Sequence, residues 1–81
     1  MTYTYKFYVE NEKVFAFLVE EDGSMIECHQ GKAISLLHVF NWLKLLMLNL
    51  LTIDGNEYRD SNSKYYAIMN LSNGKHIVSI V

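Results

Sequence analysis

The sequence contains no proline, a single cysteine, and only four glycines, which stand singly among its 81 residues. Without proline, the usual markers of linkers and disordered segments are missing, so we expect the whole chain to fold. The lone cysteine, Cys28, excludes an internal disulfide. Together with the lack of a charged and then apolar N-terminal leader, it favours a reducing, cytoplasmic location. Scattered glycines also leave no loop that could cradle a phosphate.

A strong excess of one charge is missing as well. The formal net charge is −2. Residues 1–27 hold two cations against six carboxylates, whereas residues 28–81 hold five cations against three carboxylates. Because nucleic acid attracts positive charge, the acidic N-terminal third disfavours a nucleic-acid partner. The weakly basic remainder keeps that partner open as an alternative.

Apolar residues are what the chain has in abundance, at 51% hydrophobic and 14% aromatic. Its length predicts one domain over residues 1–81. A chain this short buries little more than ~60% of the surface that it exposes when unfolded, so it needs a rich core. The composition supplies such a core without help from a disulfide.

The longest apolar stretch covers residues 33–53. On a helix at about 100° per residue, one side of it is wholly apolar. The other side mixes Ser35, His38, Asn41 and Lys44 with Leu37, Trp42, Leu45 and Leu48. A helix on a sheet needs an apolar stripe only about 100° wide, so this second side must meet loops, a partner or second copy, or lipid. A membrane span is disfavoured, since Lys44 near its middle would cost roughly 2.5–3.5 kcal/mol.

The ends of this helix are weakly marked. Gly31 is the best available N-cap, which predicts a helix over residues 32–48. A strand within residues 49–53 would then lead into the Asp54-Gly55 turn. A single helix that continues to the turn is the alternative, so its end falls between residues 44 and 53. If the strand forms, much of the apolar surplus is absorbed into the sheet, which weakens the argument for a dimer.

The segments on both sides alternate like β-strands. Strands are predicted at residues 2–9, 14–19 and 25–30, with 14–19 apolar on both faces and therefore central and covered on two sides. After the helix we predict a short strand at 57–59, a loop at 60–63, and strands at 64–71 and 76–81 around an Asn73-Gly74 hairpin turn. The predicted fold is α+β: a single antiparallel sheet of three strands, one helix and three further strands, with one extra short strand allowed and the apolar helix packed on the face of the sheet.

No constellation in the sequence indicates catalysis, a metal or a cofactor. Cys28 adjoins His29, but neighbours on a strand point to opposite faces and cannot pair with each other. The spacings of Cys28, His29, His38 and His76 match no short zinc pattern. The carboxylates at residues 54–60 surround a polar turn, where acid–base work would need a pocket that raises one pKa. We therefore predict that the protein is not an enzyme.

Two surfaces are candidates for binding a protein partner. The turn Glu20-Glu21-Asp22 could meet a basic surface and speed encounter, although charged turns are more often simply solvated. The outer face of the helix carries Trp42, a residue type enriched among interface hot spots. The contact residues predicted there, for a partner or a homodimer, are His38, Asn41, Trp42 and Leu45.

The alternative is a protein that binds single-stranded nucleic acid. Aromatic side chains on a sheet can stack on unpaired bases when cations are close by, although such aromatics more often belong to the core. The residues predicted for this contact are Arg59, Lys64, Tyr66 and Lys75.

In size, acidity and lack of motifs the chain resembles the small proteins with which phages and mobile elements block host enzymes. Anti-CRISPR proteins and the DNA-mimicking uracil-DNA glycosylase inhibitor are of this type. The resemblance covers size and composition and transfers no residue. It implies an inhibitor or regulator that occludes the surface of a protein partner, in the host cytoplasm if the protein is phage-encoded.

Overall fold

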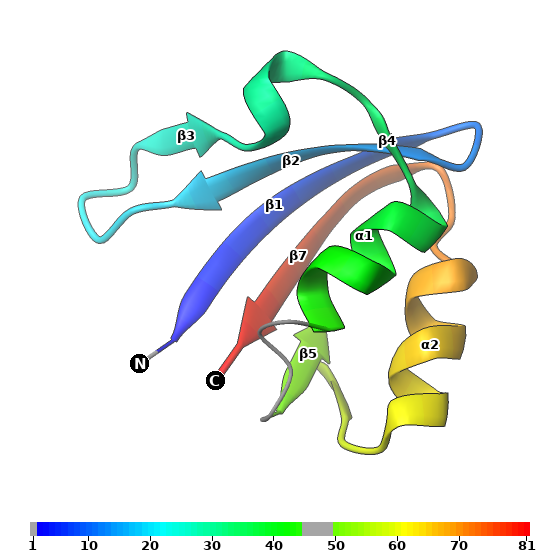
Figure 1. The fold of residues 1–81 in the computed structure, drawn as a ribbon. Helices are drawn as coiled ribbons and strands as arrows, with labels where there is room; N and C mark the ends of the chain where they lie inside the picture. Colours follow the sequence, from blue (N-terminus) through cyan, green and yellow to red (C-terminus); the bar gives the residue numbers. More distant parts are fainter. Residues whose placement is uncertain (1, 45–49) are drawn as a thin grey trace.

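The computed structural model of the protein describes residues 2–44 and 50–81. Within these residues it has one antiparallel sheet and two α-helices, which confirms the predicted α+β class (Figure 1). The strands are β1 (Tyr3–Glu10), β2 (Lys13–Val19), β3 (Met25–Glu27), β4 (Ile34–Ser35), β5 (Leu51–Ile53), β6 (Asn56–Tyr58) and β7 (Gly74–Ile80). The helices are α1 (Leu36–Lys44) and α2 (Ser61–Met69), and a 3₁₀ turn, η1 (His29–Gly31), follows β3.

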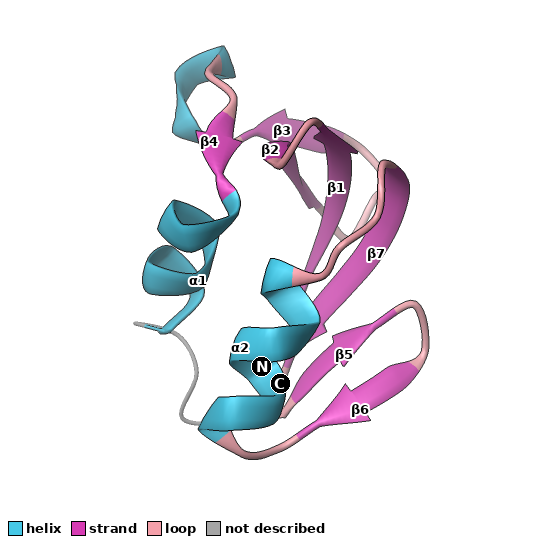
Figure 2. Ribbon diagram, turned by 90° about the vertical axis from the view of Figure 1, so that its right-hand side faces the viewer, coloured by secondary structure: helices cyan, strands magenta, loops and turns pink. Residues whose placement is uncertain are grey.

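The strand order in the sheet is β3-β2-β1-β7-β5-β6, and β4 pairs with the other end of β2. Every pairing is antiparallel. The first long strand, β1, and the last, β7, lie side by side in the middle of the sheet, as the blue and red arrows of Figure 1 show. Both helices lie on the same side of the sheet (Figure 2).

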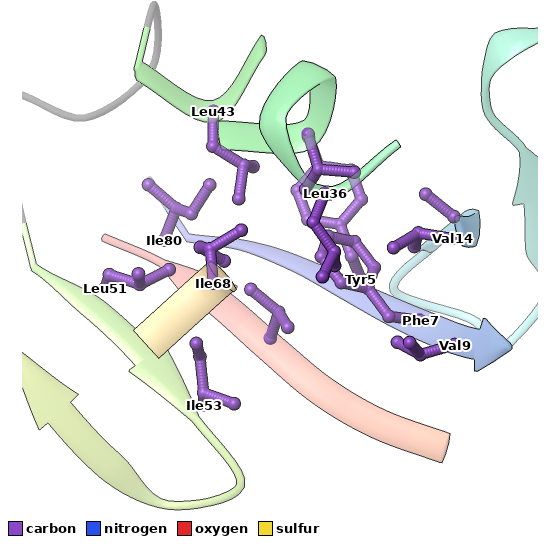
Figure 3. Close-up of a cluster of buried hydrophobic side chains, with 13 residues drawn as sticks. Tyr5, Phe7, Val9, Val14, Leu36, Leu43, Leu51, Ile53, Ile68 and Ile80 are labelled. Atoms are coloured by element: carbon purple, nitrogen blue, oxygen red, sulfur yellow. The ribbon is translucent and has the colours of Figure 1, made fainter. Parts of the chain in front are cut away.

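Alternation along β1 decides which side chains enter the core. Tyr5, Phe7 and Val9 are buried toward the helices, and the residues between them point the other way. Helix α1 adds Val39 and Leu43, one turn apart, which are both fully buried. Figure 3 shows this cluster between α1 and the sheet. Each fully buried side chain of this kind contributes roughly 1.5–3 kcal/mol.

The predicted strand at residues 64–71 is wrong, because this segment forms α2. Asp60 caps the helix: its Oδ2 accepts a hydrogen bond from the Ser63 N–H at 3.0 Å, and its Oδ1 accepts one from Ser63 Oγ at 2.7 Å. Lys64 and Ile68, four residues apart, are the buried positions of α2. The predicted loop at 60–63 is therefore the cap and first turn of a second helix, where one helix was expected.

The Asn73-Gly74 hairpin prediction is wrong for the same reason, since this dipeptide joins α2 to β7. Asn73 instead ties two loops together, its Oδ1 accepting a hydrogen bond from the Asn11 N–H at 3.1 Å. The strand predicted at residues 76–81 is confirmed as β7.

Helix α1 begins at Leu36, later than the predicted residue 32. Residues Ile34 and Ser35 pair with β2 as β4, and Ser35 Oγ accepts a hydrogen bond from the His38 N–H at 3.2 Å. Gly31 is not the N-cap; it lies in η1, which also ends the predicted strand 25–30 at Glu27. Strand β5 before the Asp54-Gly55 turn confirms the strand interpretation over a helix that continues to the turn. The part of the predicted helix at 45–48 lies outside the described residues. No helix in residues 2–44 and 50–81 is both long and apolar enough to span a bilayer.

Candidate interaction surface

The helices cover one side of the sheet, and no element formed by residues 2–44 and 50–81 packs over the middle of the other side, which we call the open face (Figure 2). The central strands β2, β1 and β7 supply its residues. They are Phe15 and Phe17 from β2, Thr4, Lys6, Tyr8 and Glu10 from β1, and Lys75, Ile77 and Ser79 from β7. The open face follows from strand alternation: the neighbours of these residues fill the core.

Aromatic and apolar side chains are exposed at the centre of the open face. The exposed fractions are 39% for Tyr8, 37% for Phe15 and 40% for Ile77. Tyr8 lies directly opposite Phe15 on β2, and its ring meets the Phe17 ring edge-on with centroids 5.6 Å apart. An open hollow of about 420 Å³ lies beside Tyr8 and Phe15. These side chains offer flat aromatic and apolar area for contact.

Two lysines stand among these aromatic residues. Lys6 lies opposite Phe17 on one side and Ile77 on the other, and Lys75 lies opposite Tyr8. Neither lysine forms an ion pair with any residue that the structure describes.

Carboxylates balance the lysines at the edges of this side of the sheet. Glu10 and Lys13 are paired positions at the end of the β1–β2 hairpin. Strand alternation places Glu27 of β3 and Glu57 of β6 on the same side, over the outer strands. The open face therefore has an apolar group of Tyr8, Phe15 and Ile77 at its centre, with Lys6 and Lys75 beside this group and carboxylates toward the edges.

Sequence reasoning missed this surface. The segment 14–19 was predicted to be covered on both faces, and this is wrong, because only Val14 and Ala16 are buried while Phe15 is exposed. A signal was present: an apolar outer row on β2 next to Tyr8 on β1. The sequence alone does not show whether a second layer covers such a row.

The acidic turn Glu20-Glu21-Asp22 connects β2 to β3, and all three residues are exposed. Asp22 Oδ1 accepts a hydrogen bond from the Ser24 N–H at 2.8 Å, and hydrogen bonding to Ser24 lowers the pKa of the Asp22 carboxyl. Glu20 and Glu21 remain the freer charges of the turn. They lie at the far end of the β1–β2 hairpin from Glu10.

The residues predicted for the outer face of the helix are not all available for contact. Trp42 is half-buried, its ring edge-on to Tyr5 at 5.1 Å and to His29 at 4.8 Å between ring centroids. It therefore packs inward, which corrects its placement on the outer face. His38 and Asn41 are exposed, and Leu45 lies outside the described residues.

The four residues predicted for nucleic-acid contact do not share one surface. Lys64 is only 5% exposed within α2, whereas Tyr66 on the same helix is 65% exposed. Arg59 pairs with Glu57 at 3.0 Å after β6. Only Lys75 lies on the open face. The expectation that Lys64 and Tyr66 sit on a strand is corrected by α2.

One polar cluster holds three segments together. His76 Nδ1 lies 2.6 Å from Asp54 Oδ2, and its Nε2 lies 2.8 Å from the Ser72 carbonyl oxygen. Asp54 Oδ1 also accepts a hydrogen bond from the Ile77 N–H at 2.9 Å. Both ring nitrogens of His76 face acceptors, so this geometry favours the imidazolium.

The pKa values of this cluster shift accordingly. Burial acts to lower the pKa of His76, but the hydrogen bonds to Asp54 and Ser72 outweigh it and raise that pKa. Burial acts to raise the pKa of Asp54, but the hydrogen bonds from Ile77 and His76 lower it overall. The cluster therefore links the β5–β6 turn to β7 and to the loop after α2.

Cys28 is half-buried, and burial raises the pKa of its thiol, which lowers the fraction of the reactive thiolate. Among the residues that the structure describes, no three His, Cys, Asp or Glu side chains gather closely enough to hold a metal ion.

Fold and surface together define an α+β protein with a sheet covered by helices on one side. None of the protein-family models, curated proteins or solved structures compared with the chain matches it.

Proposed function

We propose that the chain is a small protein-binding module, an inhibitor or regulator that uses the open face to occlude a surface of a protein partner. The observation that carries the proposal is the group of Tyr8, Phe15 and Ile77, each exposed by more than a third on a sheet side that the helices leave uncovered. Tyr8 lies opposite Phe15 on β2, and Ile77 lies diagonally across from Tyr8 on β7. Contiguous exposed apolar residues mark interaction sites more often than scattered ones. The phage-inhibitor type suggested by size and composition is part of this proposal.

The charge pattern supports a protein partner. An apolar centre with a polar rim is the usual anatomy of a protein–protein interface. On the open side of the sheet Lys6, Lys13 and Lys75 are accompanied by Glu10 and Glu27, and Glu57 is already paired with Arg59. The small excess of positive charge gives little net attraction for a polyanion.

The acidic turn has a supporting role in this proposal. Glu20 and Glu21 lie at one end of the hairpin that forms much of the open face, so they can steer a basic partner surface toward it. Reversing both charges should slow association, with a smaller effect on the lifetime of the complex.

A binding experiment with matched variants tests the proposal. The immobilised protein is exposed to extract of its native host, and captured proteins are compared for wild type, Tyr8→Lys and Tyr66→Lys. Both tyrosines are exposed, at 39% and 65%, but only Tyr8 is on the open face. Loss of an interface hot spot costs at least about 2 kcal/mol, or roughly 30-fold in affinity. Capture should therefore disappear with Tyr8→Lys and persist with Tyr66→Lys; the reverse pattern would refute the proposal.

A second candidate function is the binding of single-stranded nucleic acid, which Lys6 and Lys75 beside Tyr8 and Phe15 favour. Its contacts would then be on the open face and not on α2. A fluorescent oligothymidine titrated at low and high salt separates the candidates. Binding that weakens steeply with salt and is lost in Lys6→Gln and Lys75→Gln would support nucleic acid and contradict the protein-binding proposal.

A further inference from the structure

The outward residues of β1 have opposite charges at equal distances from one aromatic residue. Lys6 lies two residues before Tyr8 and Glu10 two residues after it, all on the open face. At about 3.4 Å per residue, each charge lies roughly 7 Å from Tyr8 along the strand. Neither charged side chain has an ion-pair partner among the described residues. If a second copy of the row Lys6-Tyr8-Glu10 is turned end to end about Tyr8, each of its charges therefore meets the opposite charge of the first copy.

A two-fold axis relates two copies in this way. The axis lies midway between the two facing open faces, passes over Tyr8 and runs perpendicular to the strands. Each β1 then lies antiparallel over the partner's β1. Lys6 then faces the partner's Glu10, Glu10 faces the partner's Lys6, and Tyr8 and Phe15 each meet their own copies. Two sheets packed in this way cross at about 30° and lie about 10 Å apart, distances that lysine and glutamate side chains can bridge.

We propose that two copies of the chain form a symmetric dimer through their open faces, with Lys6 and Glu10 setting the register. The inference uses the same surface as the proposed function, so a second copy and the protein partner compete for it. The apolar centre supplies the driving force. The two equivalent ion pairs mainly fix how the two sheets are aligned, and they add little to the affinity of the dimer.

The arrangement also has one unfavourable pair. Lys75 lies opposite Tyr8 on the neighbouring strand, so the two-fold axis that passes over Tyr8 also passes over Lys75. Lys75 therefore approaches the partner's Lys75. Replacing this lysine by a neutral residue, as in Lys75→Gln, should tighten the dimer. A stacking arrangement with another axis does not predict this gain.

Light scattering after size exclusion tests the proposal at about 100 µM chain, well above the micromolar dissociation constants of weak interfaces. Wild type should elute with twice the 9.5 kDa mass of one chain. Lys6→Glu and Glu10→Lys should each be monomeric, because each places like charges opposite each other. Mixing these two variants should restore a dimer, since the glutamates of one then face the lysines of the other.

The mixture also controls for folding, because a variant that failed to fold would not pair with the other. A monomeric wild type, dimeric single variants, or a mixture that stays monomeric would each overturn the dimer. The dimer and the proposed function can fail separately. A monomeric wild type that still captures a partner through Tyr8 refutes only the dimer, and a dimer that captures nothing refutes only the proposed function.

Discussion

At the scale of single residues, the β1–β2 turn places non-glycine residues in a backbone conformation that favours glycine. Asn11 and Glu12 have φ of 49° and 62°, both in the left-handed region. Two consecutive left-handed residues make the turn type whose twist matches a hairpin, and the preferred pair is Asn-Gly. Asn11 suits its place, whereas Glu12 bears the steric cost of a Cβ there.

Replacing Glu12 by glycine should therefore stabilise the protein. Glycine removes the strain of the left-handed conformation, and this outweighs the greater conformational entropy that glycine gives the unfolded chain. We expect the free energy of unfolding to rise by about 0.5–1 kcal/mol. Urea unfolding followed by circular dichroism measures it. Lys13→Gly is the control. Because Lys13 begins β2, this variant should be less stable than wild type. A lower midpoint for Glu12→Gly would contradict the backbone assigned to this turn.

At the scale of elements, the sheet shows what could be predicted and what could not. Strand alternation and the Asp54-Gly55 turn are local signals, so β1, β2 and the turn after β5 follow from the sequence. Helix α2 does not, because residues 64–69 contain two tyrosines and an isoleucine that favour strands. The deciding features are the Asp60 cap and the burial of Ile68 against other elements, and burial is not visible in sequence. The open face was missed for the same reason.

The two sides of the sheet should respond differently to truncation of a phenylalanine. Phe7 on β1 is fully buried and lies directly opposite Ala16 on β2, whereas Phe15, next to Ala16 in sequence, is 37% exposed. Phe7→Ala should cost about 3–5 kcal/mol through lost burial and a cavity. Phe15→Ala should cost about 1 kcal/mol or less, because surface substitutions have small effects. Equal losses in chemical denaturation would mean that a further layer covers the open face.

At the scale of the whole molecule, the His76 cluster joins the β5–β6 turn, the loop after α2 and the central strand β7. Asp54 in the turn and His76 on β7 are 22 residues apart in sequence. Because His76 lies opposite Phe7 across β1 and β7, the cluster also closes one end of the core. Its protonation state therefore bears on global stability.

The pKa directions predict how stability depends on pH. The raised pKa of His76 contributes stability that is fully present below its unfolded value of about 6.5 and is lost as pH rises through the folded value. The lowered pKa of Asp54 contributes stability above about 3.9, which is lost as pH falls through the folded value. The cluster should thus stabilise most between about pH 4 and 6.5.

The size of this effect is small, about 1 kcal/mol or less, since the Asp54 side chain is 44% exposed and solvent screens the pair. Thermal unfolding of wild type and His76→Gln from about pH 5 to 8 measures it. Wild type should lose stability as pH rises, and the variant should show a flatter profile. A wild-type stability that increases with pH over this range would refute the assigned imidazolium.

The position of β7 between β1 and β5 has a consequence for synthesis on the ribosome. Until residues 74–80 have emerged, β1 has only β2 as a neighbour, and the β5–β6 hairpin has no link to the rest of the sheet. Most of the fold must wait for that one segment, so a nascent chain that stalls before it would expose both unpaired strand edges to chaperones and proteases.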